Sequence, residues 1–184
     1  LDGKEIPFGN GQTIMDAALA AGVYIPHLCH RPGLTPHGSC KLCTVEVNGR
    51  SASACTLPAA SGQQVSNNTT ALNDARRTIT QMLFIEGNHI CPSCEKSGDC
   101  TLQAVAYHLG MLDGHFPQFF TRREVDASHA TVMLDRDRCI LCELCVRASR
   151  ERPDRSPGRA SHLRVPFARP GDFTSSRALR ARPH

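Results

Sequence analysis

The chain has 184 residues, 40% of them apolar, no tryptophan and a formal net charge of +4. It contains no run of about eighteen apolar residues and no signal-peptide pattern at its start, so we expect neither a membrane span nor secretion but a cytoplasmic protein. Because the chain starts at Leu1, we also expect a short N-terminal piece to be absent. Residues 150–184 hold nine arginines and three acidic residues, which leaves a slightly acidic body with 12 basic and 14 acidic residues.

The N-terminal part of the chain carries turn and helix signals. An Asp-Gly turn at residues 2–3 predicts a strand at residues 5–7. Thr13, followed three residues later by a carboxylate, resembles a capping box and predicts a helix over residues 14–21, which Gly22 ends.

Further elements are predicted in chain order. Alternating residues on both sides of an Asn-Gly dipeptide predict a hairpin of strands at 44–47 and 50–55. Apolar spacing predicts two amphipathic helices, at 73–86 and 101–109, and the apolar face expected for the first consists of Ala75, Ile79, Met82 and Leu83. We expect residues 111–130 to be irregular, 132–134 to form a short strand, and 140–149 to form a helix.

Ten cysteines fall in three groups with the spacing of iron–sulfur ligand sets. Thiolates a few residues apart can surround one inorganic core, whereas cysteines that form disulfides are usually scattered, so disulfides are the weaker interpretation. The groups are Cys29, Cys40, Cys43 and Cys55; Cys91, Cys94 and Cys100; and Cys139, Cys142 and Cys145.

The first group supplies four thiolates in the order of a plant-type [2Fe-2S] ferredoxin, with a longer first gap. Gly38 and Ser39, just before Cys40, allow the backbone to approach the sulfur atoms closely. Four-thiolate zinc is the rival interpretation. It is less favoured because structural zinc sites usually combine two short Cys pairs, and this group has one.

The second and third groups each supply three thiolates, which fit a [4Fe-4S] cluster that needs one further ligand. For the second group His89 is the nearest candidate, and His108 and His115 lie further along the chain. The third group repeats the first three steps of the bacterial ferredoxin pattern, but Ser149 stands where that pattern has its next cysteine. The fourth ligand of the third group must therefore come from elsewhere.

Four stretches within residues 1–151 resemble the diaphorase small subunit of soluble NAD-reducing [NiFe] hydrogenases, which is itself similar to the N-terminal region of the large iron–sulfur subunit of respiratory complex I. They are 29–34 with 38–47, 86–100, 102–104 and 137–148. Complex I subunits usually place a ligand histidine four residues before the first cysteine of the second group. That position is Gly87 here, and His89 has the spacing of the hydrogenase branch.

The resemblance implies an α+β fold in successive parts. Residues 1–70 would form a β-grasp [2Fe-2S] ferredoxin-like domain, 71–115 a small helical His/Cys [4Fe-4S] domain, and 131–151 the start of a [4Fe-4S] ferredoxin-like domain. After Arg150 the family pattern stops. Residues 152–184 are rich in Arg and Pro, and we interpret this tail as a shifted reading frame rather than a basic nucleic-acid arm or a solvated tail. An intact frame on resequencing would contradict that hypothesis.

The function implied by the resemblance is electron relay within an NAD-dependent oxidoreductase. A flavin/NAD(H) diaphorase partner would hold FMN and NAD, because this sequence has no dinucleotide or P-loop motif, and hydrogenase small and large subunits would lie at the other end. We expect no catalytic residues in this chain, and we expect Glu95 and Asp99 to be solvated charges. The equivalent subunit of complex I or of an NAD-linked formate dehydrogenase is the first alternative. A zinc-stabilised interaction or nucleic-acid module is the remote one.

Overall fold

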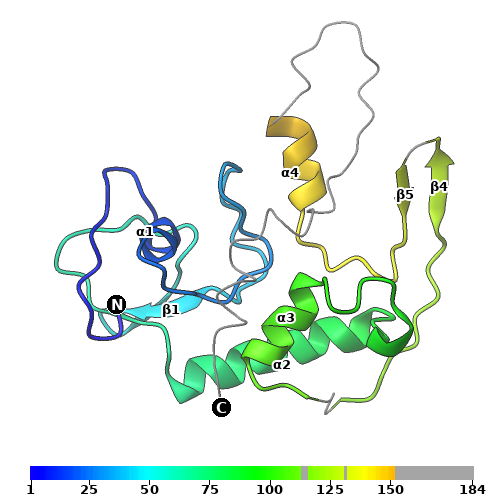
Figure 1. Ribbon diagram of the computed structural model, residues 1–184, viewed down its shortest axis with the longest axis horizontal. Helices are drawn as coiled ribbons and strands as arrows, with labels where there is room; N and C mark the ends of the chain where they lie inside the picture. The colour runs from blue at the N-terminus through cyan, green and yellow to red at the C-terminus, as the bar shows by residue number, and fades with distance from the viewer. Residues whose placement is uncertain (113–115, 131, 152–184) are drawn as a thin grey trace, which may run out of the picture. The chain divides into compact units, whose positions relative to one another are not determined.

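The computed structural model describes residues 1–112, 116–130 and 132–151 (Figure 1). His115 and the Arg- and Pro-rich segment 152–184 therefore lie outside the described residues. The chain divides into two units, the first from Leu1 to Thr80 and the second from Gln81 onward. In the described part of the chain, every helix is too short or too polar to cross a lipid bilayer.

A three-stranded antiparallel sheet forms the centre of the first unit. Strand β1 (Thr44–Val47) lies between β2 (Arg50–Ser53) and β3 (Val65–Ser66). The predicted hairpin is confirmed, with β1 and β2 joined by Asn48 and Gly49 at φ 50° and 77°. Both residues are left-handed, as the tight turn between twisted strands requires.

Helix α1 (Ile14–Ala20) packs its apolar face against the sheet. Its predicted capping box is confirmed, because the Thr13 side chain accepts from the Asp16 amide at 3.2 Å and the Asp16 carboxylate accepts from the Thr13 amide at 3.0 Å. Met15 and Ala18 are buried in the core that α1 shares with β1. Two cysteines, Cys43 and Cys55, belong to the same core.

The predicted strand at residues 5–7 is wrong. The Asp2-Gly3 turn is present, with the Lys4 amide donating to the Leu1 carbonyl at 3.0 Å, but no strand follows it. Pro7 has no amide hydrogen to donate to a neighbouring strand. Instead, the Asp2 amide donates to the Val65 carbonyl at 2.8 Å, which attaches the N-terminus beside β3.

Helix α2 (Thr70–Glu86) confirms the helix expected at 73–86 but begins three residues earlier. Its predicted apolar face is wrong, because Met82 is 56% exposed and Ala75 is also exposed. The buried positions include the polar residues Arg76 and Thr80, at 2% and 0% exposure. Apolar spacing could not find this face, since hydrogen bonds rather than hydrocarbon contacts hold its polar side chains.

Two helical elements accompany the second cysteine group. A short 3-10 turn, η1 (Cys91–Ser93), precedes helix α3 (Thr101–His108). Leu102, Val105, Ala106 and Leu109 are buried, which confirms the amphipathic helix predicted at 101–109.

The last described elements correct two expectations. Residues 111–130 are not wholly irregular, because β4 (Asp126–His129) pairs antiparallel with β5 (Val132–Leu134), the strand that was predicted. Helix α4 (Leu144–Glu151) begins four residues later than predicted. Leu141 and Glu143 have φ values of 53° and 56°, which a right-handed helix does not accommodate.

Candidate metal centres

The four cysteines of the first group meet in the first unit. Cys29, Cys43 and Cys55 are buried at 0%, 0% and 1% exposure, and Cys40 is half-buried. The Sγ atoms of Cys43 and Cys55 lie 3.4 Å apart, and the Cys29 thiol interacts with both Cys40 and Cys55. Four sulfur donors therefore share one largely buried site, and Cys40 is its most exposed member.

The hairpin explains why cysteines twelve residues apart in sequence come together. In the register of β1 and β2, Thr44 faces Ser53, so the residues just outside this pair also lie across from one another. The Ala54 amide donates to the Cys43 carbonyl at 3.0 Å, which continues the ladder past the strands. Cys55 then turns inward onto the same core as Cys43.

The loop that carries Cys40 depends on left-handed backbone. Gly38 has a φ of 72°, and a Cβ atom added there would lie 3.1 Å from Cγ2 of Thr56. Lys41, between Cys40 and Cys43, has a φ of 57° although it is not glycine. Non-glycine residues adopt this conformation rarely and often at functional sites, so the loop is shaped around its sulfur atoms.

The thiols of this group perturb one another. Hydrogen bonds from Cys40 and Cys55 lower the pKa of Cys29, and a hydrogen bond from Cys55 lowers the pKa of Cys43 to about 7. The pKa values of Cys40 and Cys55 are raised, first because each hydrogen-bonds to the Cys29 thiol. A hydrogen bond to Cys43 raises the pKa of Cys55 further, and burial disfavours both thiolates. Two members are therefore readily deprotonated. A group with several positive charges would be needed to hold all four as thiolates, and an iron–sulfur core fits that donor set.

In the second unit, the side chains of the second group line a single cavity of about 30 Å³. His89 follows the end of α2, Cys91 opens η1, Cys94 follows η1, and Cys100 is the N-cap of α3. The Lys96 amide donates to the Cys94 sulfur at 3.4 Å, and the Gly98 amide is held by the Gln103 side chain at 2.7 Å. Burial raises the pKa of Cys91. Three sulfur atoms and one imidazole thus share this cavity.

His89 fits the role of a ligand on geometric grounds. Its Nε2 atom is buried and has no hydrogen-bond partner among the described residues, which is costly unless something else occupies that lone pair. Burial lowers the pKa of His89, so the ring is neutral and able to coordinate. His108, by contrast, is exposed on α3 and is not among the residues that line the cavity.

Gly87 lies where the backbone of Asp137 and the ring of His89 leave little space. A Cβ atom at this position would lie 2.5 Å from the backbone oxygen of Asp137 and 2.7 Å from Nε2 of His89. The φ of Gly87 is not positive, so crowding and not conformation requires glycine here. The position that would carry histidine in the complex I pattern therefore has no room for a side chain in this structure.

The third group is more open. Cys139 and Cys145 are exposed and Cys142 is half-buried, with its pKa raised by burial. The left-handed residues Leu141 and Glu143 flank Cys142 and turn the loop at each step. The Arg147 guanidinium donates to the Cys142 carbonyl at 3.3 Å, which ties α4 back to this loop.

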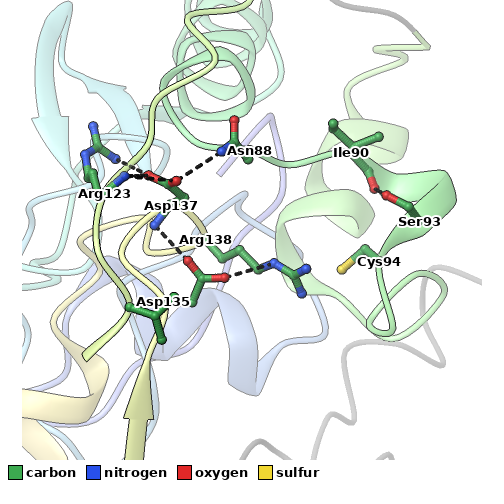
Figure 2. A pocket seen from close by; sticks show the side chains of 9 residues that line it. Asn88, Ile90, Ser93, Cys94, Arg123, Asp135, Asp137 and Arg138 are labelled. Atoms are coloured by element: carbon green, nitrogen blue, oxygen red, sulfur yellow. Dashed lines mark hydrogen bonds and ion pairs between the residues drawn. The ribbon is translucent and has the colours of Figure 1, made fainter. Parts of the chain in front are cut away.

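Polar contacts join the segments that precede the second and third groups. Figure 2 shows Asp137 accepting from the side chain of Asn88 at 3.1 Å and from the amide of Arg123 at 3.1 Å. The Nη1 atom of Arg138 donates to both carboxylate oxygens of Glu95, the residue after Cys94, at 2.7 and 2.9 Å. Glu95 is 72% exposed, so it is a solvated charge as expected, and it also pairs with Arg138. A cavity of about 300 Å³ is lined in part by Asn88, Arg123, Asp137 and Arg138.

Sequence reasoning missed Arg76, Asn88 and Asp137, because nothing in their spacing marks them. None of the ten cysteines forms a disulfide. Within the described ranges, neither these cysteine sites nor any other three His, Cys, Asp or Glu side chains are arranged around a single metal ion.

Comparisons with known proteins identify two iron–sulfur regions in this chain. Residues 1–70 match the 2Fe-2S iron-sulfur cluster binding domain, and residues 76–115 match the NADH-ubiquinone oxidoreductase-G iron-sulfur binding region. The chain is 45% identical over 159 residues to the gamma subunit of the NAD-reducing hydrogenase HoxS of Cupriavidus necator, covering 86% of this chain and 67% of that protein.

Two further relatives extend the comparison. A crystal structure of an NAD+-reducing [NiFe]-hydrogenase in the H2-reduced state contains a chain that matches with a TM-score of 0.77 and 58% identity, over 80% of this chain and 63% of that one. A subunit of the NADH-quinone oxidoreductase of Streptomyces coelicolor is 35% identical over 156 residues, which are 82% of this chain and 18% of that protein.

The fold and the cysteine sites define an iron–sulfur electron-transfer protein with a 2Fe-2S cluster binding domain followed by a 4Fe-4S region of the NADH-ubiquinone oxidoreductase-G type. Within that class, the chain belongs to the family of gamma subunits of NAD-reducing hydrogenases, the iron–sulfur subunits of an oxidoreductase complex.

Proposed function

We propose that this chain relays electrons between a flavin/NAD(H) diaphorase partner and the small and large subunits of a hydrogenase. The observation that carries the proposal is the meeting of four cysteines in a buried site of the first unit, in a chain of the hydrogenase gamma family. The iron–sulfur groups supply one-electron redox chemistry when bound. This chain's residues set their burial, spacing and hydrogen bonding, and FMN and NAD belong to the partner.

The positions of the cysteines and of His89 support the ligands that we propose. The first group would hold a [2Fe-2S] cluster through four thiolates. The second would hold a [4Fe-4S] cluster through three thiolates and Nε2 of His89, an atom of the shared cavity's lining residue that has no hydrogen-bond partner in the part of the chain that the structure describes. The third would hold another [4Fe-4S] cluster through three thiolates and one ligand from outside the described residues.

These assignments give a domain division that we also propose. Residues 1–70 form a β-grasp [2Fe-2S] domain, 71–115 the His/Cys [4Fe-4S] domain, and 131–151 the start of a [4Fe-4S] ferredoxin-like domain. We place the protein in the cytoplasm.

The exposed apolar side chains support docking of partner subunits. Among the described residues, Phe8 is the single exposed large apolar residue of the first unit, whereas the second unit exposes many, with Leu112 at 87% and Met133 at 70%. Apolar surface of this kind marks interaction sites. The second unit is therefore the part of the chain that we expect partners to cover.

The proposal is tested on the full chain prepared without oxygen. We expect bound iron, acid-labile sulfide, and electron paramagnetic resonance signals of both a [2Fe-2S] and a [4Fe-4S] cluster after reduction. Cys55→Ser should remove the [2Fe-2S] signal and leave the [4Fe-4S] signal, while the neighbouring control Thr56→Ser should change neither. Colourless protein that contains zinc and no sulfide would contradict the proposal and favour the zinc module.

The complex I alternative rests on the match to the NADH-quinone oxidoreductase of Streptomyces coelicolor. Co-purification with neighbouring gene products separates the two functions. Hydrogenase subunits and hydrogen-dependent NAD+ reduction support the relay proposed here, whereas quinone-reductase subunits support the alternative.

A further inference from the structure

Arg76 is a buried cation whose hydrogen bonds all go to uncharged groups. It lies in the N-terminal half of α2 at 2% exposure. Its Nε donates to the Leu42 carbonyl at 2.9 Å, and its terminal nitrogens donate to the Thr44 carbonyl at 2.7 Å and the Asn67 carbonyl at 2.8 Å. The side-chain oxygens of Asn67 and Asn73 complete the set at 2.7 and 3.0 Å.

The charge of this guanidinium is not balanced by a contacting anion. Among the described residues, no carboxylate accepts a hydrogen bond from Arg76 or lies in ion-pair contact with it. The nearby Asp2 carboxylate instead accepts from the amides of Asn67 and Asn68, at 2.7 and 3.2 Å. Burying a charge is costly unless an opposite charge compensates, and carbonyl dipoles satisfy the donors without neutralising the cation.

Two of the carbonyls that bind Arg76 belong to residues beside the sulfur site, so this site offers a countercharge in addition to the Asp2 carboxylate. Leu42 and Thr44 are the residues on either side of Cys43, whose side chain is fully buried against Cys55. Arg76 therefore holds the backbone on both sides of one cysteine of the first group. A two-iron core with four thiolates carries net negative charge, and accepting one electron makes it more negative by one unit.

We propose that Arg76 is a positioning residue and the buried countercharge of the first cysteine site, and that its positive charge favours the reduced state of the [2Fe-2S] cluster. The inference depends on the proposed function, because it requires a cluster bound at this site. In the low-dielectric interior, a fixed positive charge stabilises an added negative charge more than it would in water. The electron comes from the flavin partner or, in the test, from dithionite.

A purely structural role makes a different prediction. If Arg76 only holds the backbone, its loss lowers stability and leaves the reduction potential of the remaining cluster unchanged. If its charge matters, the potential becomes more negative when that charge is removed or neutralised. The experiment therefore needs variants that separate charge from hydrogen bonding.

Four variants of the full chain make this separation. Arg76→Gln removes the charge, and Arg76→Lys keeps the charge but loses the planar set of donors. Asn67→Asp places a carboxylate next to the Arg76 guanidinium, while Arg76 and all four cysteines remain. Asn73→Asp also places a carboxylate next to the guanidinium, but at a residue that is only half-buried. The control is Arg77→Gln, which makes the same change in net charge at the next residue, where the arginine pairs with Asp74 at 2.7 Å.

The measurement is a redox titration of anaerobic protein that follows the electron paramagnetic resonance signal of the reduced [2Fe-2S] cluster. For Arg76→Gln and Asn67→Asp we expect the ratio of reduced to oxidised cluster at a fixed potential to fall about tenfold, a shift of about 59 mV to more negative values. In Asn73→Asp the reduction potential should also become more negative, but by a smaller amount. In Arg76→Lys the ratio of reduced to oxidised cluster should lie within about threefold of the wild-type ratio. In Arg77→Gln the ratio should equal that of the wild type.

Each outcome of the titration either supports or overturns the inference about Arg76. Wild-type midpoints in Asn67→Asp and Arg76→Gln with the cluster bound would overturn the inference and leave the proposed function standing. If Arg76→Gln does not hold iron, the two Asp variants decide, because they retain Arg76. Loss of iron from both Asp variants would show a purely structural role and overturn the inference, whereas absence of cluster from the wild type would overturn the proposed function as well.

Discussion

Asn88 binds Asp137 twice, once through its backbone amide to the Asp137 carbonyl at 2.7 Å and once through its side chain to the carboxylate at 3.1 Å. Asn88 directly precedes His89, and Asp137 lies two residues before Cys139. The buried Asp137 carboxylate also accepts from the Thr121 hydroxyl at 3.1 Å. One carboxylate therefore fixes the chain next to the second and third ligand groups.

We expect Asp137→Ala to destabilise the second unit by about 2 to 3 kcal/mol, because several donors lose a charged acceptor at once. The amide of Arg123 and the side chain of Asn88 would both be left without this partner. Thermal unfolding of the iron-loaded protein and iron content per chain measure the effect. Asp99→Asn is the matched control and should change neither, and an unchanged unfolding temperature in Asp137→Ala would refute the role.

His89 offers a direct test of the fourth ligand. We expect His89→Ala to lose most of the [4Fe-4S] signal that belongs to the second group, since its cavity would then supply three ligands. His89→Cys should recover part of it with an altered spectrum, because a thiolate replaces the imidazole. The control His108→Ala changes an exposed histidine of the same unit and should keep the wild-type signal. Loss of the signal in the control alone would assign the ligand to His108.

Gly38 should resist substitution for two separable reasons. We expect Gly38→Ala to cost about 1 to 2 kcal/mol for the left-handed backbone, plus a smaller amount for the contact with Thr56 at 3.1 Å. Thr56→Ser removes the crowding methyl group, so the double variant should regain the smaller part only. Denaturant unfolding of the four chains gives both terms, and full recovery in the double variant would show that backbone conformation does not matter here.

The capping box of α1 should contribute measurably to the first unit. Thr13→Ala removes the side chain that accepts from the Asp16 amide, and we expect a loss of about 1 kcal/mol. Thr13→Ser keeps the hydroxyl and should lose little. Equal destabilisation by both substitutions would mean that the methyl group, not the cap, stabilises the helix.

The sequence predicted those elements that depend only on interactions between residues close together in the chain. The hairpin around Asn48 and Gly49, the cap at Thr13 and the apolar face of α3 follow from turn geometry, side-chain capping and helical periodicity. Cysteine spacing predicted three groups of thiols, and the structure brings the four cysteines of the first group close together.

Elements that depend on tertiary contacts were not predictable in this way. The buried face of α2 includes polar side chains, and Arg76 is buried there because it reaches carbonyls 32 and 34 residues away in sequence. Strand β4 has the sequence Asp-Ala-Ser-His, which has little strand propensity and forms through pairing with β5. The late start of α4 depends on the left-handed residues Leu141 and Glu143, and neither is a glycine that would have marked such a conformation in the sequence.

The crowding at Gly87 has an evolutionary consequence. A lineage that moved its imidazole from the complex I position to residue 89, or back again, could not do so by keeping both rings at once, because the second ring and the backbone of Asp137 fill the space that the first would need. We therefore expect an intermediate between the two arrangements to have either no histidine at these positions or a displaced loop. We expect natural chains of this superfamily to carry one or the other, and seldom both.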